Sequence, residues 1–127
     1  KKMNAPRIYL INRTKEKALK LKNLFNDLTI LDWGEFPEFD MMINATSLGL
    51  NENDKFDIDF EKLGKNKFYY DVIYEPYETE FSKAGHIVGN TYENGLNMFL
   101  FQAQKAFNIW HNIEPNINEE VIKFIRS

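Results

Sequence analysis

Short apolar runs along the chain alternate with segments whose apolar residues recur every three or four positions. The runs are rich in β-branched and aromatic residues and are bounded by polar or turn-forming residues, which is typical of buried β-strands. They predict five strands, at residues 7–12, 28–31, 40–45, 67–74 and 86–88. The segments with helical spacing predict four helices, at residues 15–26, 79–84, 93–111 and 118–125. Residues 51–66 are polar and irregular, with one helical turn expected near Phe60.

Strands that alternate with helices favour parallel pairing through right-handed crossovers. The predicted fold class is therefore α/β, with a Rossmann-like three-layer parallel sheet, and residues 1–127 form one domain closed by helices at about 93–126. Such a domain normally opens with a strand, a glycine-rich turn and a helix. The chain contains no Gly-x-Gly-x-x-Gly sequence, and residues 1–4 resemble the tail of a helix. The sheet is accordingly predicted to be incomplete, lacking its first strand and its glycine-rich loop.

A chain of 127 residues with 43% hydrophobic and 15% aromatic residues is sized for a single domain with a core. It has no cysteine, which excludes a disulfide framework, a thiolate metal site and a cysteine nucleophile. No apolar run approaches the roughly 18 residues that span a bilayer, and the first residues do not resemble a signal peptide. These features predict a cytoplasmic protein without a membrane partner.

Positive charge is concentrated at the start of the chain, although the formal net charge is −3. Residues 1–22 carry eight lysines and arginines and one acidic residue, Glu16. A basic segment can indicate nucleic-acid binding, but no aromatic platform is interleaved with these cations and the whole chain is acidic. We therefore expect no nucleic-acid partner. A solvated helix face and a phosphate site are the two explanations that stay open.

Arg13 and Lys17 lie four residues apart at the start of the first helix, so both side chains can point the same way. In a dinucleotide-binding fold, an acidic residue at the end of the second strand favours NAD, and an arginine accommodates the 2′-phosphate of NADP. Two charge-assisted hydrogen bonds would favour NADP by about a hundredfold or more. On spacing alone, however, the interpretation as ordinary surface cations is favoured.

Polar and small residues also follow the third strand and stand on the longest helix. Residues 44–49 (Asn-Ala-Thr-Ser-Leu-Gly) would either let a ligand approach the backbone or form a plain turn. Gln102 stands in an apolar setting and needs a hydrogen-bond partner, either backbone or a substrate hydroxyl. Asp71 is expected to bond local backbone rather than to act as a base. Neither His86 nor His111 has neighbours with metal-ligand spacing, so no metal site is predicted.

Four segments together resemble the cofactor-binding half of shikimate dehydrogenases. Residues 12–18 (Asn-Arg-Thr-Lys-Glu-Lys-Ala) are similar to the NRTxx(R/K)A motif of that family, and residues 44–49 to its NATSxG segment. Residues 70–74 resemble its YDxxY strand end, and residues 95–103 its GxxMxxxQA helix. Each motif alone is weak, but the set occurs in family order and covers nearly the whole chain.

The resemblance implies a role for each matched residue. The adenosine 2′-phosphate of NADP would be held by Asn12, Arg13, Thr14 and Lys17. The path of the cofactor would be lined by Ala45, Thr46, Ser47 and Leu48. The nicotinamide would be surrounded by Val72, Gly95 and Met98. Shikimate would be contacted from the cofactor side by Tyr74 and Gln102. Lys17 stands where many members have arginine, a change expected to soften the preference for NADP.

The family reaction is the reversible, NADPH-dependent reduction of 3-dehydroshikimate to shikimate, in the route to chorismate and aromatic amino acids. Family members carry a catalytic Lys and Asp on a preceding substrate-binding domain, and no position here matches either motif. The resemblance therefore implies an NADP-dependent oxidoreductase in which this chain holds no catalytic residue and is inactive by itself. The oligomeric state stays open between monomer and homodimer.

Other functions stay open as alternatives. One is a non-catalytic nucleotide-binding or interaction module that kept the fold and lost the chemistry. Another is part of a related enzyme, such as a quinate/shikimate or a methylenetetrahydrofolate dehydrogenase. The presence of both Tyr74 and Gln102 favours the shikimate group.

Overall fold

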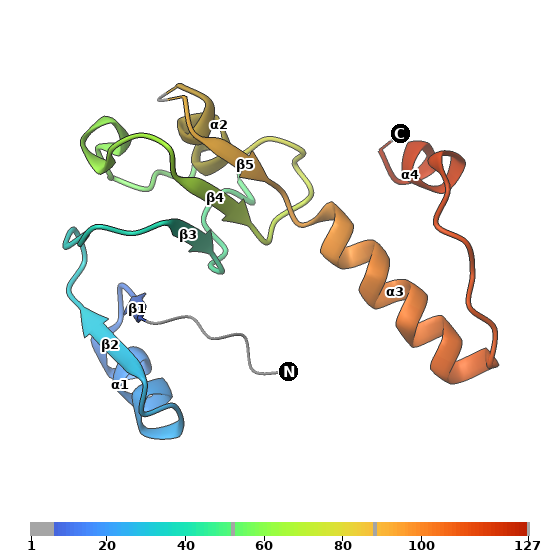
Figure 1. The fold of residues 1–127 in the computed structure, drawn as a ribbon, viewed down its shortest axis with the longest axis horizontal. Helices are drawn as coiled ribbons and strands as arrows, with labels where there is room; N and C mark the ends of the chain where they lie inside the picture. Colours follow the sequence, from blue (N-terminus) through green and yellow to red (C-terminus); the bar gives the residue numbers. More distant parts are fainter. Residues whose placement is uncertain (1–6, 52, 88, 127) are drawn as a thin grey trace. The chain divides into compact units, whose positions relative to one another are not determined.

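The computed structural model describes residues 7–51, 53–87 and 89–126. The chain divides into two compact units, Lys1–Glu38 and Phe39–Ser127. Each unit is built on parallel β-strands (Figure 1). The helix tail expected at residues 1–4, and position 88 of the strand expected at residues 86–88, lie outside the described residues.

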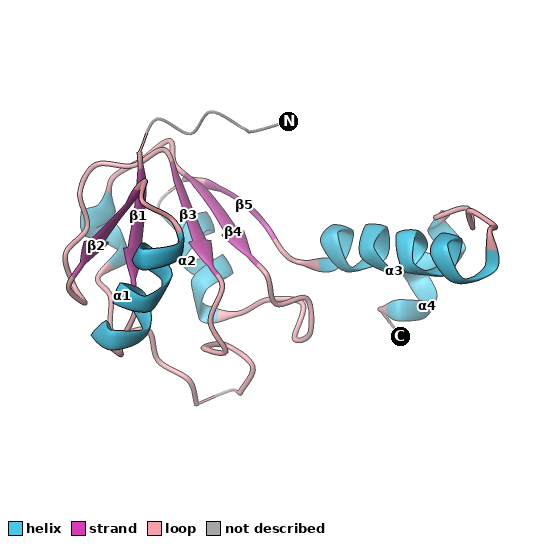
Figure 2. Ribbon diagram, turned by 90° about the horizontal axis from the view of Figure 1, so that it is seen from below, coloured by secondary structure: helices cyan, strands magenta, loops and turns pink. Residues whose placement is uncertain are grey.

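The first unit is a single β-α-β crossover. Strand β1 (Ile8–Ile11) pairs in parallel with strand β2 (Leu28–Leu31), and helix α1 (Lys15–Leu24) connects them. Ala18 of α1 is buried, and Figure 2 shows the helix beside the two strands. The two strands and the helix predicted here are confirmed, but the burial expected for the strands is wrong: Ile8 is 46% exposed, and the other residues of β1 and β2 are half-buried or exposed. The helix ends earlier than predicted because Phe25 takes up an extended conformation.

Three parallel strands, in the order β3-β4-β5, form the sheet of the second unit. Their bounds are β3 Met41–Asn44, β4 Phe68–Asp71 and β5 Thr91–Glu93. A short 3-10 helix, η1 (Phe60–Leu63), lies between β3 and β4 in the chain, and helix α2 (Glu80–Ile87) connects β4 to β5. The helical turn expected near Phe60 is therefore confirmed. In the strand register Asn44 stands opposite Asp71, so the carboxyl ends of β3 and β4 coincide.

Aromatic side chains form the core of this sheet. Tyr69 of β4 is fully buried, and its ring meets the ring of Phe81 at 5.4 Å and that of Phe60 at 6.1 Å, both in edge-on geometry. Phe56 lies 5.5 Å from Phe81. Such edge-to-face contacts add to the stabilisation that burial of the rings provides. The core therefore holds α2 and η1 against β4.

The strand predicted at residues 86–88 is wrong, and the third strand of the sheet is Thr91–Glu93. Helix α2 continues past Gly85, whose lack of a side chain lets it approach Tyr92: a Cβ at this position would be 3.3 Å from the Tyr92 Cβ. The chain then turns at Gly89, whose φ of 71° lies in the left-handed region that favours glycine. Only after this turn does the chain run alongside β4.

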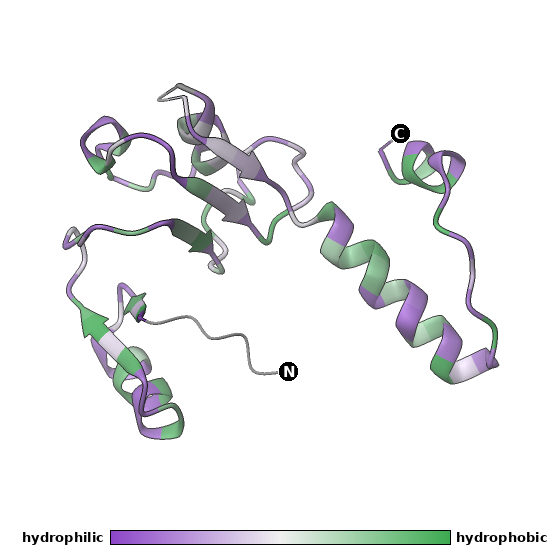
Figure 3. Cartoon of the chain, in the orientation of Figure 1, coloured by the Kyte–Doolittle hydropathy of each residue, from purple (hydrophilic) through white to green (hydrophobic). Residues whose placement is uncertain are grey.

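Two helices complete the second unit, α3 (Leu96–His111) and α4 (Glu119–Ile125). Helix α3 begins later than predicted because β5 occupies the residues before it. It ends at Asn112, which is left-handed with a φ of 53°, so the helix stops before Pro115. The Asn118 side chain caps α4. Figure 3 shows apolar and polar residues interspersed along α3 and an apolar β3.

The fold class predicted from the sequence is confirmed, since parallel strands alternate with helices. The described strands form two separate ladders, of two and three parallel strands, in line with the incomplete sheet predicted from the sequence. Among the helices that the structure describes, none is both long enough and apolar enough to cross a membrane.

Candidate functional site

The chain turns between β1 and α1 at Asn12, Arg13 and Thr14. The Asn12 side-chain oxygen accepts a hydrogen bond from the Thr14 N–H at 2.9 Å, which closes an Asx turn. Thr14 is the N-cap residue of α1, and Arg13 is exposed at the turn. Two of the predicted residues, Asn12 and Thr14, therefore shape the turn that carries a third, Arg13, to the start of the helix.

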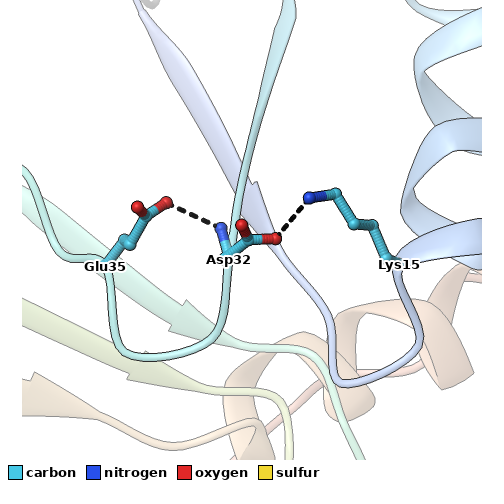
Figure 4. A network of polar contacts seen from close by, with 3 residues as sticks. All are labelled: Lys15, Asp32 and Glu35. Atoms are coloured by element: carbon cyan, nitrogen blue, oxygen red, sulfur yellow. Dashed lines mark hydrogen bonds and ion pairs between the residues drawn. The ribbon is translucent and has the colours of Figure 1, made fainter.

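Lys15 is paired within the first unit. Its Nζ lies 2.6 Å from Oδ1 of Asp32, which comes directly after β2 (Figure 4). The Asp32 N–H donates to Oε2 of Glu35 at 2.9 Å, so the loop after β2 belongs to the same network. The hydrogen bond to Asp32 raises the pKa of Lys15. This lysine is therefore committed to tying the start of α1 to the end of β2.

Arg13 and Lys17, by contrast, are exposed. Within the described ranges, neither side chain makes a hydrogen bond or an ion pair with another residue. Arg13 offers a planar fork of donors and Lys17 a point charge, both at the N-terminal end of α1. Anions are favoured at this end of a helix. The pair can therefore bind an anion such as a phosphate group.

A buried amide–carboxylate pair joins the ends of β3 and β4. Asn44 Nδ2 donates to Asp71 Oδ1 at 2.9 Å, and the two residues are only 3% and 1% exposed. The Asp71 carboxylate also accepts from the Ile73 N–H at 3.1 Å and from the Thr79 hydroxyl at 2.5 Å. The expectation that Asp71 bonds local backbone is confirmed. The part played by Thr79 could not be predicted, since nothing in its local sequence pattern links it to β4.

The loop after β3 is folded by its own side chains. Asn44 Oδ1 accepts from the N–H and the hydroxyl of Thr46, at 3.1 and 2.7 Å. The Thr46 oxygen accepts in turn from the Leu48 N–H at 3.1 Å. Ala45, Thr46 and Ser47 are exposed, but the Thr46 hydroxyl is already committed to the loop. Among the described residues the Ser47 hydroxyl has no partner, so this is the hydroxyl that the loop presents.

The backbone of Gly95 approaches the end of β4 closely. The Gly95 N–H donates to the Ile73 carbonyl at 3.1 Å, and a Cβ on Gly95 would lie 2.0 Å from the Val72 carbonyl oxygen. Its φ of −72° is open to any residue, so this contact, and not the backbone conformation, requires glycine. Two predicted residues, Val72 and Gly95, are therefore in direct contact.

Tyr74 follows β4 and is held by α3. Its ring stacks on Phe99, with the ring centroids 4.6 Å apart and the ring planes at 20°. Met98, in the first turn of α3, is half-buried. The stacking restricts the rotation of Tyr74 and thereby sets the direction of its hydroxyl.

Gln102 is exposed, and the apolar setting expected for it is wrong. Helix α3 buries Leu96 and Leu100. Because successive helical residues are rotated by about 100°, Gln102 points to nearly the opposite side from Leu100. Its amide has no hydrogen-bond partner among the residues that the structure describes. The same residues contain no group of three His, Cys, Asp or Glu side chains that could hold a metal ion.

No protein-family model matches the chain, but the chain is similar to curated proteins and to solved structures, among which shikimate dehydrogenases recur. A curated NADP(+) shikimate dehydrogenase of Pelagibacter ubique is 50% identical over 125 residues, which are 98% of this chain and 47% of that protein. A crystal structure of shikimate dehydrogenase from Aquifex aeolicus is 33% identical with a TM-score of 0.75, over 87% of this chain and 41% of that one. Shikimate 5-dehydrogenase from Thermus thermophilus, in complex with NADP(H) and shikimate, is 26% identical with a TM-score of 0.75, over 87% and 42%. The chain spans about half the length of the curated relatives it matches.

Proposed function

We propose that this chain, which is related to shikimate dehydrogenases over almost its whole length, is the cofactor-binding part of an NADP-dependent shikimate dehydrogenase. The observation that carries the proposal is the 50% identity to the Pelagibacter ubique enzyme over 98% of the chain. The whole protein catalyses the reversible reduction of 3-dehydroshikimate to shikimate, in the route to chorismate and the aromatic amino acids. Residues 1–127 act in it as one domain, closed by helices at about 93–126.

The 2′-phosphate of NADP is bound in this proposal by Arg13 and Lys17, on the turn that Asn12 and Thr14 shape. What supports the assignment is that both cations are exposed and have no partner among the described residues, whereas Lys15, which lies between them in the chain, is 2.6 Å from an aspartate oxygen. Hydrogen bonds from cations to a phosphate are charge-assisted and roughly twice as strong as neutral ones. The first unit therefore fits a phosphorylated ribose better than a free 2′-hydroxyl.

The nicotinamide and the substrate are assigned to the second unit. The cofactor path is lined by Ala45, Thr46, Ser47 and Leu48. The nicotinamide is surrounded by Val72, Gly95 and Met98. When bound, NADPH supplies the hydride that reduces the substrate carbonyl. Tyr74 and Gln102 bind substrate hydroxyls, which is supported by the stacked ring of Tyr74 and by the exposed amide of Gln102.

The chain contributes binding and orientation, and none of its residues is proposed as the acid or base. The catalytic Lys and Asp of the family are assigned to the other half of the protein. We therefore expect the isolated chain of 127 residues to oxidise no shikimate with NADP above background. The protein is proposed to be cytoplasmic, monomeric or homodimeric, and without nucleic-acid or membrane partners.

An assay of the full-length protein tests the proposal, with NADPH formation from shikimate and NADP followed by absorbance. Activity is expected, and Gln102→Ala should lower kcat/KM for shikimate about three- to tenfold, because one hydrogen bond to the substrate is lost. Gln104→Ala is the matched control: its amide, on the same helix, is used by the Pro115 carbonyl at 2.7 Å. That variant should leave kcat/KM for shikimate unchanged. Unchanged kinetics in Gln102→Ala would remove the substrate assignment.

The same assay separates the alternatives. A folded full-length protein that binds 2′,5′-ADP but oxidises no shikimate would be a nucleotide-binding module. Oxidation of quinate with a kcat/KM comparable to that for shikimate would instead indicate a quinate/shikimate dehydrogenase.

A further inference from the structure

One buried carboxylate, that of Asp71, is bonded to two of the segments proposed to bind ligands. Its Oδ1 accepts from Asn44 Nδ2 at 2.9 Å and from the Ile73 N–H at 3.1 Å. Its Oδ2 accepts from the Thr79 hydroxyl at 2.5 Å. Asp71 is 1% exposed, so no ligand can reach it directly. Any influence on binding must act through its hydrogen-bond partners.

The first arm of this network runs through Asn44 into the loop after β3. A carboxylate only accepts hydrogen bonds, so Asp71 fixes which end of the Asn44 amide faces it. Nδ2 donates to Asp71 and to the Leu48 carbonyl, the latter at 3.0 Å, and Oδ1 is thereby directed at Thr46. The Thr46 oxygen then receives the Leu48 N–H at 3.1 Å. The conformation of residues 45–48 thus depends on the orientation of one buried amide.

The second arm runs through Ile73 into the segment after β4. The Ile73 N–H donates to Asp71, and its carbonyl accepts from the Gly95 N–H at 3.1 Å. The Val72 N–H donates to the backbone oxygen of Asn44 at 3.0 Å, which ties the two arms together. The segment that carries Val72, and the start of α3, therefore share one anchor with the loop after β3.

We propose that Asp71 is a positioning residue, which orients residues 45–48 through Asn44 and residues 72–74 through Ile73, so that both segments present their ligand-binding groups in one fixed arrangement. The inference rests on the function proposed above, because these segments are the ones assigned to the cofactor and the substrate. A fully satisfied buried polar network rigidifies its surroundings. A site ordered before binding loses less conformational freedom when the ligand arrives, and so binds it more tightly.

The two oxygens of the Asp71 carboxylate have different partners, so variants of those partners can distinguish a positioning role from a purely structural one. Thr79, on Oδ2, caps α2 together with Ser82: the Thr79 N–H donates to Ser82 Oγ at 2.9 Å, and the Ser82 N–H donates to Thr79 Oγ1 at 3.2 Å. The Oδ2 arm therefore leads into α2, and the Oδ1 arm leads to the candidate ligand segments. Cutting either arm removes buried hydrogen bonds, but only the Oδ1 arm is expected to change the affinity for NADP.

The test measures KM for NADP, kcat, Tm and amide hydrogen exchange in the full-length protein. Thr46→Val, which cuts the Oδ1 arm, and Asp71→Ala, which cuts both arms, should each raise KM for NADP about tenfold with a smaller effect on kcat. Both should also speed exchange of the Leu48 amide about tenfold. Thr79→Val, the matched cut of the Oδ2 arm, should lower Tm and leave KM within about twofold.

Two conservative variants test rescue. Asp71→Asn keeps one side-chain oxygen, which can still accept from Asn44 and Ile73. The new side-chain NH₂ group can donate to the Thr79 hydroxyl. Thr46→Ser keeps the hydroxyl that joins Asn44 to Leu48. Asp71→Asn should hold KM for NADP within about threefold of the unmodified protein, and Thr46→Ser should hold exchange of the Leu48 amide within about threefold.

Unchanged KM and unchanged Leu48 exchange in Thr46→Val and Asp71→Ala would overturn the proposal. So would a rise of KM in Thr79→Val as large as that in Asp71→Ala, since Asp71 would then be structural only. If Asp71→Ala does not fold, Thr46→Val, Thr46→Ser and Asp71→Asn test the proposal by the same measurements. An unmodified protein without NADP-dependent activity would overturn the proposed function instead. The exchange measurement needs no ligand, so it would still test the Asp71 network.

Discussion

A Cβ atom on Gly95 would lie 2.0 Å from the carbonyl oxygen of Val72, a separation that Cβ atoms essentially never show. Gly95, the residue just before α3, therefore contacts the backbone that follows β4 directly. The Gly95 N–H completes the contact by donating to the next carbonyl, that of Ile73, at 3.1 Å. Backbone atoms alone thus fix where α3 departs from the sheet.

Gly95→Ala should lower the free energy of unfolding by about 3 kcal/mol or more, since overpacking typically costs roughly 1–3 kcal/mol. The reason is that the clashing atom belongs to the backbone and cannot rotate away. Urea unfolding measures the loss. Gly34→Ala is the control. Gly34 has open space for a Cβ and a φ of 92°, so its replacement should cost only about 1 kcal/mol of unfolding free energy, for the backbone conformation. Equal, small losses at the two positions would mean that α3 is not seated on Val72.

Arg13→Ala should weaken the binding of 2′,5′-ADP roughly 10- to 100-fold and leave the binding of 5′-AMP nearly unchanged, because only the 2′-phosphate contact is lost. Titration calorimetry with the two nucleotides measures the difference. Lys15→Ala is the matched control, since Lys15 is already paired with Asp32. It should reduce both affinities little. Equal losses for the two nucleotides in Arg13→Ala would contradict the 2′-phosphate assignment.

Tyr69→Phe should raise the free energy of unfolding by about 1 kcal/mol. Tyr69 is fully buried, burial raises its pKa, and its hydroxyl has no hydrogen-bond partner among the described residues. The variant removes an unpaired polar group and keeps the ring contact with Phe81. Thermal or urea unfolding measures the change, with Tyr70→Phe, at a half-buried ring, as a control expected to be near neutral. A clear loss of stability in Tyr69→Phe would show that the hydroxyl has a partner.

The loop that follows Gly49 should lose its order in acid. The backbone N–H groups of Asn51 and Gly49 bond the Asp54 carboxylate and hold its pKa below the usual 3.8. A lowered pKa in the folded state means that the stabilisation is fully present above pH 3.8 and disappears as the pH falls through the lower folded value. The amide chemical shifts of Gly49 and Asn51 should therefore change together in that range.

Asp54→Asn is the control for this titration. An amide side chain does not ionise, so the coupled change of the two amide shifts below pH 3.8 should vanish. A change of the same size and midpoint in that variant would assign the titration to another group.

Local patterns were sufficient for the two strands of the first unit. The apolar runs around Ile8–Ile11 and Leu28–Leu31 are too short for core helices and too apolar for loops, so their strands follow from the sequence. The same reasoning failed after Ala84. Whether the chain stays helical there depends on how closely Gly85 can approach Tyr92, a residue on a different element. That contact is not encoded in the spacing of apolar residues.

The sequence by itself determined where the candidate groups stand: Arg13 after the first strand, Thr46 after the third and Gln102 on the long helix. The tertiary structure alone decided which of their atoms are available, because hydrogen bonds join residues far apart in the chain. Lys15 is paired with an aspartate 17 residues away, whereas Arg13 has no partner among the residues that the structure describes. The hydroxyl of Thr46 is taken by an amide that Asp71, from the neighbouring strand, holds in place.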